Sequence, residues 1–114
     1  MLLVMLGTAE WRAGQPDAIA HLEQALAAAD DDLGALIGAT LVLAPAYMTI
    51  DQAERSVEVL ERTLAAAGKT SASLALTLEA SIAGVGLMND RTAPAALPRA
   101  ELLRARLDTL ADPP

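Results

Sequence analysis

Residues 22–29 read LEQALAAA and residues 60–67 read LERTLAAA, so that six of eight positions are identical at a spacing of 38 residues. Ala and Leu, which make up most of the match, are the strongest apolar helix formers. In both copies the leucines and alanines recur at the three- and four-residue spacing of one helix face. A repeat of this length with a helical pattern predicts a chain built from repeated helical units.

Charged residues alternate with uncharged stretches along the chain. Residues 33–50 carry no charge, and residues 70–89 carry only Glu79. Buried helices that alternate with half-exposed helices produce such a pattern. We therefore expect residues 33–43 and 72–83 to be the most buried. The charged blocks around them are residues 10–32, 51–69 and 90–112.

Glycine, proline and aspartate residues mark the expected boundaries of the first three helices. The first helix is predicted over residues 2–13, with Gly14 able to take the left-handed conformation that ends a helix. Pro16 suits the first turn of the second helix. The three aspartates at residues 30–32 can cap the third helix. Pro45 is expected to end or kink that helix, because its ring removes a backbone donor.

Three more helices are predicted in the second half of the chain. Thr49 and Gln52 have capping-box spacing before the fourth helix, which Gly68 ends. Thr70 or Ser71 is expected to cap the fifth helix. A turn at residues 89–92 follows, and Pro94 opens the sixth helix. The expected apolar stripes are Ala18, Ile19, Leu22, Ala25, Leu26 and Ala29 in the second helix, Ala53, Val57, Leu60, Leu64 and Ala67 in the fourth, and Leu97, Ala100, Leu103, Leu107 and Leu110 in the sixth.

The composition supports an all-α fold. The 114 residues include 26 Ala and 20 Leu, but only 11 of the Val, Ile, Tyr, Trp and Phe residues that favour strands. We predict one domain over residues 1–114, made of about six helices in three stacked antiparallel hairpins. The expected hairpins cover residues 1–30, 31–68 and 69–112.

The charge of the chain argues against nucleic acid and membrane partners. The net charge is −7 and the eight Lys and Arg are scattered, so we expect no direct contact with nucleic acid. Residues 33–50 are long enough for a marginal transmembrane helix, but Pro45 interrupts them and aspartates flank them. They predict a buried helix instead. Gly34 and Gly38, at small-xxx-small spacing, are explained by close packing inside the stack.

The single histidine and the two aromatic residues are candidates for a site. His21 has no Cys or second His with which to share a metal, and it falls beside the apolar stripe, which indicates a surface position. Trp11 and Tyr47 could anchor a partner or fill a core that is poor in bulky side chains. We favour packing for both.

Two further clusters fail the tests for a binding site. Asp30, Asp31 and Asp32 lack the glycine and glutamate that a calcium loop needs at its sixth and twelfth positions. Gly84 and Gly86 follow no strand and precede no phosphate-binding Lys, so they are expected to fray or bend the fifth helix. We therefore predict no catalytic, cofactor-binding or metal site, and the sequence assigns no partner-binding residue.

The first half of the chain resembles a tetratricopeptide repeat, which pairs two antiparallel helices with small residues where they cross. The resemblance implies an α-solenoid. The chain departs from the motif because its period is 38 rather than about 34 residues and no Pro closes the first repeat. The residues that carry the resemblance are Leu6, Gly7, Ala13, Gly14, Ala18, Leu22, Ala25 and Leu26.

A narrower resemblance concerns residues 13–26, AGQPDAIAHLEQAL. This stretch is similar to the helical-repeat region of large ATP-binding LuxR-type regulators of actinobacteria. In that family an ATPase module precedes the repeats and a helix-turn-helix module ends the chain. The resemblance implies a cytoplasmic fragment of a signal-dependent transcription regulator, and no functional residue carries over.

The leading functional hypothesis is a non-enzymatic interaction or sensor module without a cofactor. Its partner would be a protein, a peptide or a neighbouring domain of the same chain, and a homodimer is possible. The alternative is a free-standing tetratricopeptide-like adaptor that binds a peptide. Stacked repeats suit both, since they leave extended surfaces open. The outer faces of the charged helices and the two ends of the stack are the places where we expect binding.

Overall fold

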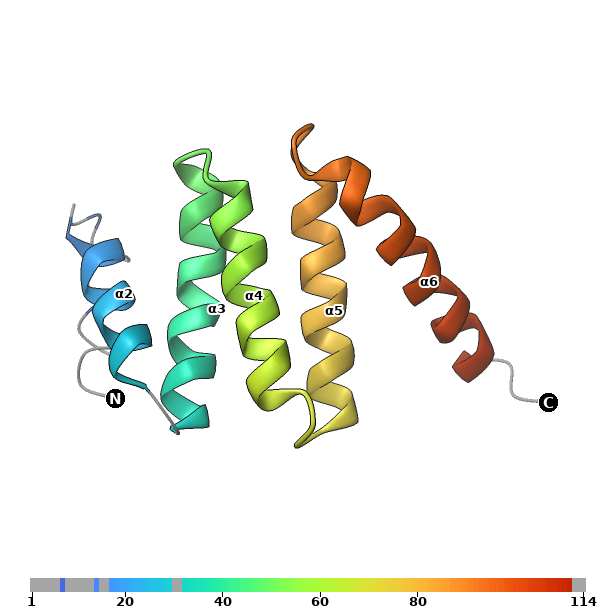
Figure 1. Cartoon of the computed structure of the whole chain (residues 1–114), viewed down its shortest axis with the longest axis horizontal. Helices are drawn as coiled ribbons and strands as arrows, with labels where there is room; N and C mark the ends of the chain where they lie inside the picture. Colours follow the sequence, from blue (N-terminus) through green and yellow to red (C-terminus); the bar gives the residue numbers. More distant parts are fainter. Residues whose placement is uncertain (1–6, 8–13, 15–16, 30–31, 112–114) are drawn as a thin grey trace.

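The computed structural model describes residues 7, 14, 17–29 and 32–111, and all regular structure in this part of the chain is helical. The labels follow Figure 1. The first predicted helix, at residues 2–13, lies outside the described residues apart from Gly7. The helices are α2 (Ala18–Ala28), α3 (Leu33–Thr49), α4 (Ala53–Ala67), α5 (Ala72–Leu87) and α6 (Ala93–Ala111).

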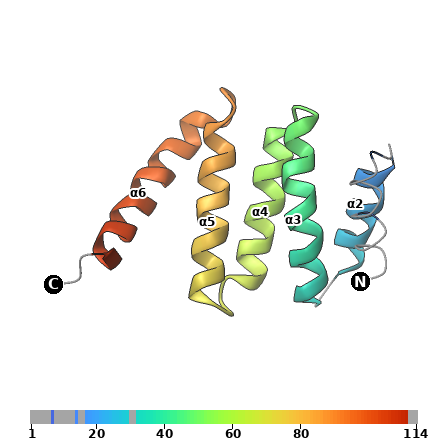
Figure 2. The same ribbon diagram turned by 180° about the vertical axis from the view of Figure 1, so that it is seen from behind.

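The five helices stand in a row, and successive helices run in opposite directions (Figures 1 and 2). Each helix packs chiefly against the helices that precede and follow it in the chain. The helix starts recur at similar spacings, since α4 begins 35 residues after α2, α5 begins 39 residues after α3 and α6 begins 40 residues after α4. These spacings lie on either side of the 38-residue repeat of the sequence.

The core follows the predicted stripes of α2 and α4. Leu22 of α2, Leu43 of α3 and Ile82 of α5 are fully buried in one apolar cluster that these helices share with α4. The stripe predicted for α6 is wrong at Leu97 and Leu107, which are exposed. Leu97 is exposed because its neighbour Ala96 takes the contact with Gly86 of α5. Leu107 lies near the far end of α6, which diverges from α5 along its length (Figure 1).

Hydroxyl groups join α3 to α4 inside this core. The Thr63 hydroxyl donates to the Val59 carbonyl at 2.9 Å and lies 2.6 Å from the Thr40 hydroxyl, which makes Thr40 the donor of that bond. The Ser56 hydroxyl donates to the Ala44 carbonyl at 2.8 Å. Every buried polar side-chain atom of the described residues has a partner, so none imposes the cost of an unsatisfied group.

The helix caps confirm two predictions and correct one. The Asp32 carboxylate accepts from Ala35 N at 3.0 Å, and the Ser71 hydroxyl accepts from Leu74 N at 3.2 Å. The capping box predicted before α4 is wrong. The Thr49 hydroxyl donates back to the Ala46 carbonyl of its own helix, and the Gln52 side chain makes no capping bond.

Of the two effects predicted for Pro45, an end or a kink of the third helix, the structure excludes the end, because α3 continues to Thr49. Proline deprives the carbonyl four residues earlier of its donor, here that of Leu41. Both Leu41 and Pro45 are exposed, so water can reach the freed carbonyl. The helix therefore tolerates the proline on its outer face.

The two uncharged helices are buried to different extents. Five residues between 33 and 43 are buried, as predicted, but only three between 72 and 83 are buried. The prediction for 72–83 is wrong because the diverging α6 leaves much of α5 uncovered (Figure 2). The buried residues are Ala35, Leu36, Ala39, Thr40 and Leu43 in α3, and Leu78, Ile82 and Ala83 in α5.

Candidate functional site

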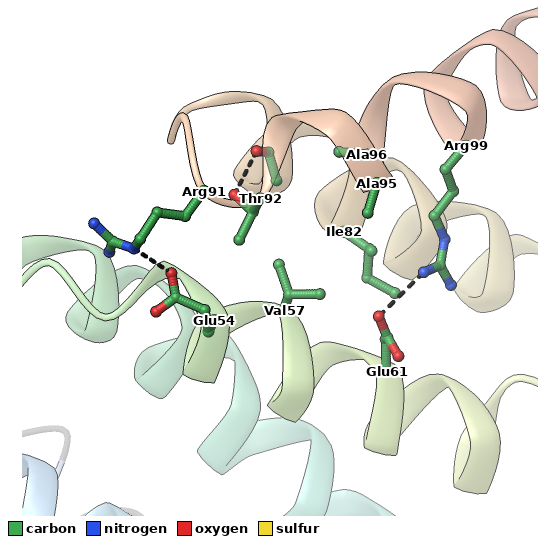
Figure 3. A pocket seen from close by; sticks show the side chains of 10 residues that line it. Glu54, Val57, Glu61, Ile82, Arg91, Thr92, Ala95, Ala96 and Arg99 are labelled. Atoms are coloured by element: carbon green, nitrogen blue, oxygen red, sulfur yellow. Dashed lines mark hydrogen bonds and ion pairs between the residues drawn. The ribbon is translucent and has the colours of Figure 1, made fainter.

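The concave surfaces on the described part of the chain include two of about 260 and 290 Å³ and a smaller one of about 180 Å³ beside Tyr47 and Arg55. The first, the α4–α6 pocket, has a volume of about 260 Å³ and is shown in Figure 3. Its floor is apolar and its rim carries two arginines and two glutamates. The lining residues are Glu54, Val57, Glu61, Ile82, Gly86, Arg91, Thr92, Ala95, Ala96 and Arg99.

The charges on the rim of the α4–α6 pocket are paired with one another. Arg91 Nε lies 2.6 Å from Glu54 Oε1, and Arg99 Nη1 lies 3.2 Å from Glu61 Oε1. Hydrogen bonds with Glu54 and Asp51 raise the pKa of Arg91. A ligand would have to displace these pairs to use their charge. The geometry therefore explains this pocket better as the seam that holds α6 than as a binding site.

A close backbone approach supports this interpretation. A Cβ atom placed on Gly86 would lie 2.6 Å from the Cβ of Ala96. The Thr92 hydroxyl donates to the Gly86 carbonyl at 2.6 Å and so ties the start of α6 to the end of α5. Gly84 and Gly86 were expected to fray or bend the fifth helix; both lie within α5, which continues to Leu87. Gly86 serves helix packing.

Tyr47 packs into the core with its hydroxyl aimed at α2. It is 5% exposed and its hydroxyl donates to Glu23 Oε2 at 2.8 Å. Arg55 Nη1 lies 3.7 Å from the same carboxylate oxygen. The prediction that Tyr47 packs is confirmed, whereas Trp11 lies outside the described residues. Glu23, Tyr47 and Arg55 together link α2, α3 and α4.

The phenol of Tyr47 is expected to lose its proton at a higher pH than an exposed tyrosine does. Burial, followed by the hydrogen bond to Glu23, raises its pKa from 10.0 to about 12. The unfolded chain would release this proton near pH 10, so the stabilising contribution is present below pH 10 and is lost between pH 10 and 12. Its size is about 2–3 kcal/mol. Tyr47 is the only tyrosine, so tyrosinate absorbance reports it alone.

Glu23→Gln serves as the control for this titration. It keeps the burial of Tyr47 but removes the charge that opposes phenolate formation. The midpoint should fall below that of the unaltered chain and stay above 10. A midpoint near 10 in the unaltered chain, while circular dichroism still shows it folded, would contradict the buried position of the hydroxyl.

The second concave surface, the α3–α5 groove, has a volume of about 290 Å³. Residues of α3 and α5 form its walls and Leu60 of α4 lies in its floor. Met88, the residue that follows α5, extends one wall. The groove is defined by Thr40, Leu41, Ala44, Pro45, Met48, Leu60, Ser81, Val85 and Met88.

The α3–α5 groove is apolar and carries no charge. Leu41 is 62% exposed and Met88 is 74% exposed. α3 has no charged residue, and the one charge of α5, Glu79, pairs with Arg106 of α6 at 2.6 Å. Contiguous exposed apolar surface marks interaction sites more often than scattered apolar residues do. Methionine adds adaptability, because its flexible thioether fits differently shaped partners.

The remaining sequence candidates do not converge on either surface. His21 lies half-exposed on α2, Asp32 caps α3, and Gly34 is exposed with no neighbouring helix near its Cβ position, so close packing does not explain it. No group of three or more His, Cys, Asp or Glu within the described ranges could hold a metal ion. Across the same ranges no helix has the length and apolar character needed to cross a membrane.

Sequence reasoning missed the groove because none of its residues belongs to a functional motif. Leu41, Met48 and Met88 look like ordinary core residues in the sequence. The signal that was available is the pair of uncharged blocks at residues 33–50 and 70–89, which predicted burial. Both blocks are only partly covered, and their uncovered sides meet in the groove.

The chain matches no family model, no curated protein and no solved structure. Its function is therefore argued from the two surfaces themselves.

Proposed function

We propose that this chain is a non-enzymatic helical-repeat interaction module, and that its α3–α5 groove receives an apolar helical segment of a protein partner. The observation that carries the proposal is the uncharged groove, where Leu41 and Met88 stay exposed in a chain with a net charge of −7. Leaving such side chains in water is unfavourable, and a partner that covers them would gain their transfer free energy.

A helix suits the groove better than a small molecule. α3 and α5 are alternate members of an antiparallel row, so they run in the same direction (Figure 1). Residues of both helices line the groove, together with Leu60 of α4. A helix that lies in an apolar groove presents anchors at three- and four-residue spacing. Polar groups that would fix a small ligand are few, since only the hydroxyls of Thr40 and Ser81 line the groove.

The biological setting is proposed from the resemblance of residues 13–26 to LuxR-type regulators. In that setting the segment in the groove belongs to a neighbouring domain of the same cytoplasmic protein, and its binding is coupled to the signal. In the alternative, a free-standing tetratricopeptide-like adaptor, it belongs to a separate protein. The open reading frame around the segment distinguishes the two. The tetratricopeptide-like solenoid class is part of the same proposal, supported by the recurring helix starts.

A designed peptide tests the groove. The probe is a dye-labelled amphipathic helix of about 18 residues, long enough to lie along α3, with leucines on one face and glutamines on the other. We expect saturable binding by fluorescence anisotropy. The double variant Leu41→Asp with Met88→Asp should weaken it at least about tenfold, because each aspartate would lose water beside the apolar face of the peptide.

The matched control is Leu102→Asp, because Leu102 is 69% exposed on α6 and lies away from the groove. It should leave the affinity unchanged. Circular dichroism must show all variants folded. Equal weakening by the groove and control variants, or no binding to the unaltered chain, would refute the proposed site.

A further inference from the structure

We infer that Met88 is a redox-sensitive modification site, and that oxidation of its thioether to a sulfoxide prevents the α3–α5 groove from binding an apolar helix. This inference rests on the proposed function and adds a means of regulating the same groove. Three observations carry it: the exposure of Met88, its place in the wall of the groove, and the lack of a free hydrogen-bond donor among the groove side chains.

Both methionines of the described residues line the groove. Met88 extends the wall formed by α5, and Met48 lies in the wall formed by α3. The sequence contains no cysteine, so the thioethers of methionine are the only sulfur groups of the chain. Within the described residues, an oxidant that attacks sulfur therefore acts on the groove.

The thioether of Met88 is accessible in the folded chain. Met88 is the most exposed of the large apolar side chains in the described part, whereas Met48 is half-buried. The backbone N–H of Met88 donates to the Val85 carbonyl at 3.1 Å and continues the hydrogen bonding of α5 by one residue. The backbone is thus fixed while the side chain lies in solvent. A small oxidant can reach Met88 without unfolding the helix, and it should oxidise Met88 before Met48.

The modification is the transfer of one oxygen atom from hydrogen peroxide to the sulfur of Met88. The O–O bond of the peroxide breaks and an S–O bond forms, so that the sulfur is oxidised by two electrons. The second peroxide oxygen leaves as water and carries both protons. The product is methionine sulfoxide, which is polar where the thioether is apolar.

The groove has no donor for the new oxygen atom. Its two hydroxyl groups are both engaged, since Thr40 donates to Thr63 and Ser81 donates to the Thr77 carbonyl at 3.0 Å. The other side chains that line the groove are apolar. In the free chain water can donate to the sulfoxide. An apolar helix in the groove would exclude that water and leave the oxygen unsatisfied, which is unfavourable.

Oxidation of Met88 should therefore act on binding and leave folding unchanged. The side chain is already largely in water in the free chain, so the sulfoxide loses no packing there. Met48 is different because its half-buried thioether packs in the wall of α3, and its oxidation would also disturb the fold. The variant Met48→Leu leaves Met88 as the one methionine of the groove and allows the two effects to be separated.

The test uses the dye-labelled helix with leucines on one face and glutamines on the other. The chain is treated with hydrogen peroxide, which catalase then removes, and binding is measured by fluorescence anisotropy. We expect oxidation to weaken binding at least about fivefold. The two methionine sulfoxide reductases, one for each epimer of the sulfoxide, should restore binding when dithiothreitol supplies the electrons. The urea unfolding midpoint of oxidised Met48→Leu should equal that of the untreated variant.

Trypsin separates the methionines, because Lys and Arg residues lie between them. Met88 falls on the peptide of residues 70–91 and Met48 on the peptide of residues 13–55, whereas Met1 and Met5 share residues 1–12. Mass spectrometry should find the added oxygen on residues 70–91 before it appears on residues 13–55. An excess of unlabelled helix should slow this oxidation, because the bound helix covers the thioether of Met88.

Two matched variants assign the effect to one sulfur atom. Met88→Leu keeps an apolar side chain that peroxide does not oxidise, so it should bind the helix and keep its affinity after treatment. Met48→Leu is the control, and it should lose affinity on treatment as the unaltered chain does. Met88→Gln places a polar group at the same position and should weaken binding without peroxide.

The outcomes separate this inference from the proposed function. If the untreated chain binds the helix and the sulfoxide at Met88 leaves the affinity unchanged, the proposed function stands and the redox control is wrong. The redox control is also overturned if Met88→Leu remains as sensitive to peroxide as the unaltered chain, or if Met48 is oxidised before Met88. If the untreated chain does not bind the helix, the proposed function and this inference fail together.

Discussion

Leu43→Ala is expected to lower the free energy of unfolding by about 3–5 kcal/mol. Leu43 is fully buried and belongs to the cluster that joins α2, α3, α4 and α5. Truncation removes apolar contacts and leaves a cavity that long helices fixed on several sides cannot close. Since a small domain has a stability of about 5–15 kcal/mol, the loss would be a large part of the total. Urea unfolding followed by circular dichroism measures it.

The control for Leu43→Ala is Leu41→Ala, two residues earlier in α3. Leu41 is 62% exposed, so its truncation creates no cavity, and alanine is at least as good a helix former. Its effect should stay within about 0.5 kcal/mol. Similar losses in the two variants would show that the shared apolar cluster does not hold the row of helices together.

Local signals predicted the helices of this chain well where one physical effect dominated. Ser71 and Asp32 cap helices because each places a side-chain oxygen within reach of a backbone N–H that has no partner in the first turn of the helix. Leu22 of α2 and Leu60 of α4 are buried because helical spacing gathers the apolar residues of each helix on one face, which packs against its neighbours. These features depend on neighbours within a few residues, which a sequence displays directly.

The failed predictions depend on tertiary placement. Pro45 does not end α3 because it falls on the outer face, and the sequence does not show which face is outer. Leu97 and Leu107 follow a helical stripe, but Ala96 takes the contact with α5 that was expected of Leu97, and α6 diverges from α5 before Leu107 (Figure 1). Exposure of an apolar side chain is decided by the position of its neighbouring helix, and that position is set by long-range contacts.

The position of the candidate site also depends on tertiary placement, and the sequence did not predict it. Binding was expected on the outer faces of the charged helices and at the ends of the stack. On α4 the structure shows Glu54 paired with Arg91 of the turn before α6, and Glu61 paired with Arg99 of α6. Such exposed pairs hold helices together weakly and offer little free charge to a partner. The groove lies instead between uncharged helices. A lack of charge predicted burial, and the same lack of charge makes an uncovered helix face suitable for binding.

Gly86→Val is expected to release α6 from α5. A Cβ at this position would lie 2.6 Å from the Cβ of Ala96, which is shorter than atoms of this kind tolerate, and the valine methyl groups add further bulk. The helices would have to separate, at a cost of about 1–3 kcal/mol. Hydrogen exchange should accelerate across α6 and remain unchanged in α3.

Gly84→Ala, two residues earlier in α5, isolates the packing effect. Gly84 is exposed and an added Cβ would meet no atom within 4 Å. Replacing a helical glycine with alanine in open space should stabilise the chain by about 0.5–1 kcal/mol. The two variants therefore have opposite expected signs on the same helix. If Gly86→Val matched Gly84→Ala in stability and in the exchange of α6, the close contact with Ala96 would not be what holds α6 in place. The ion pairs of Arg91, Arg99 and Arg106 would then have to hold it, and raising the salt concentration should release it.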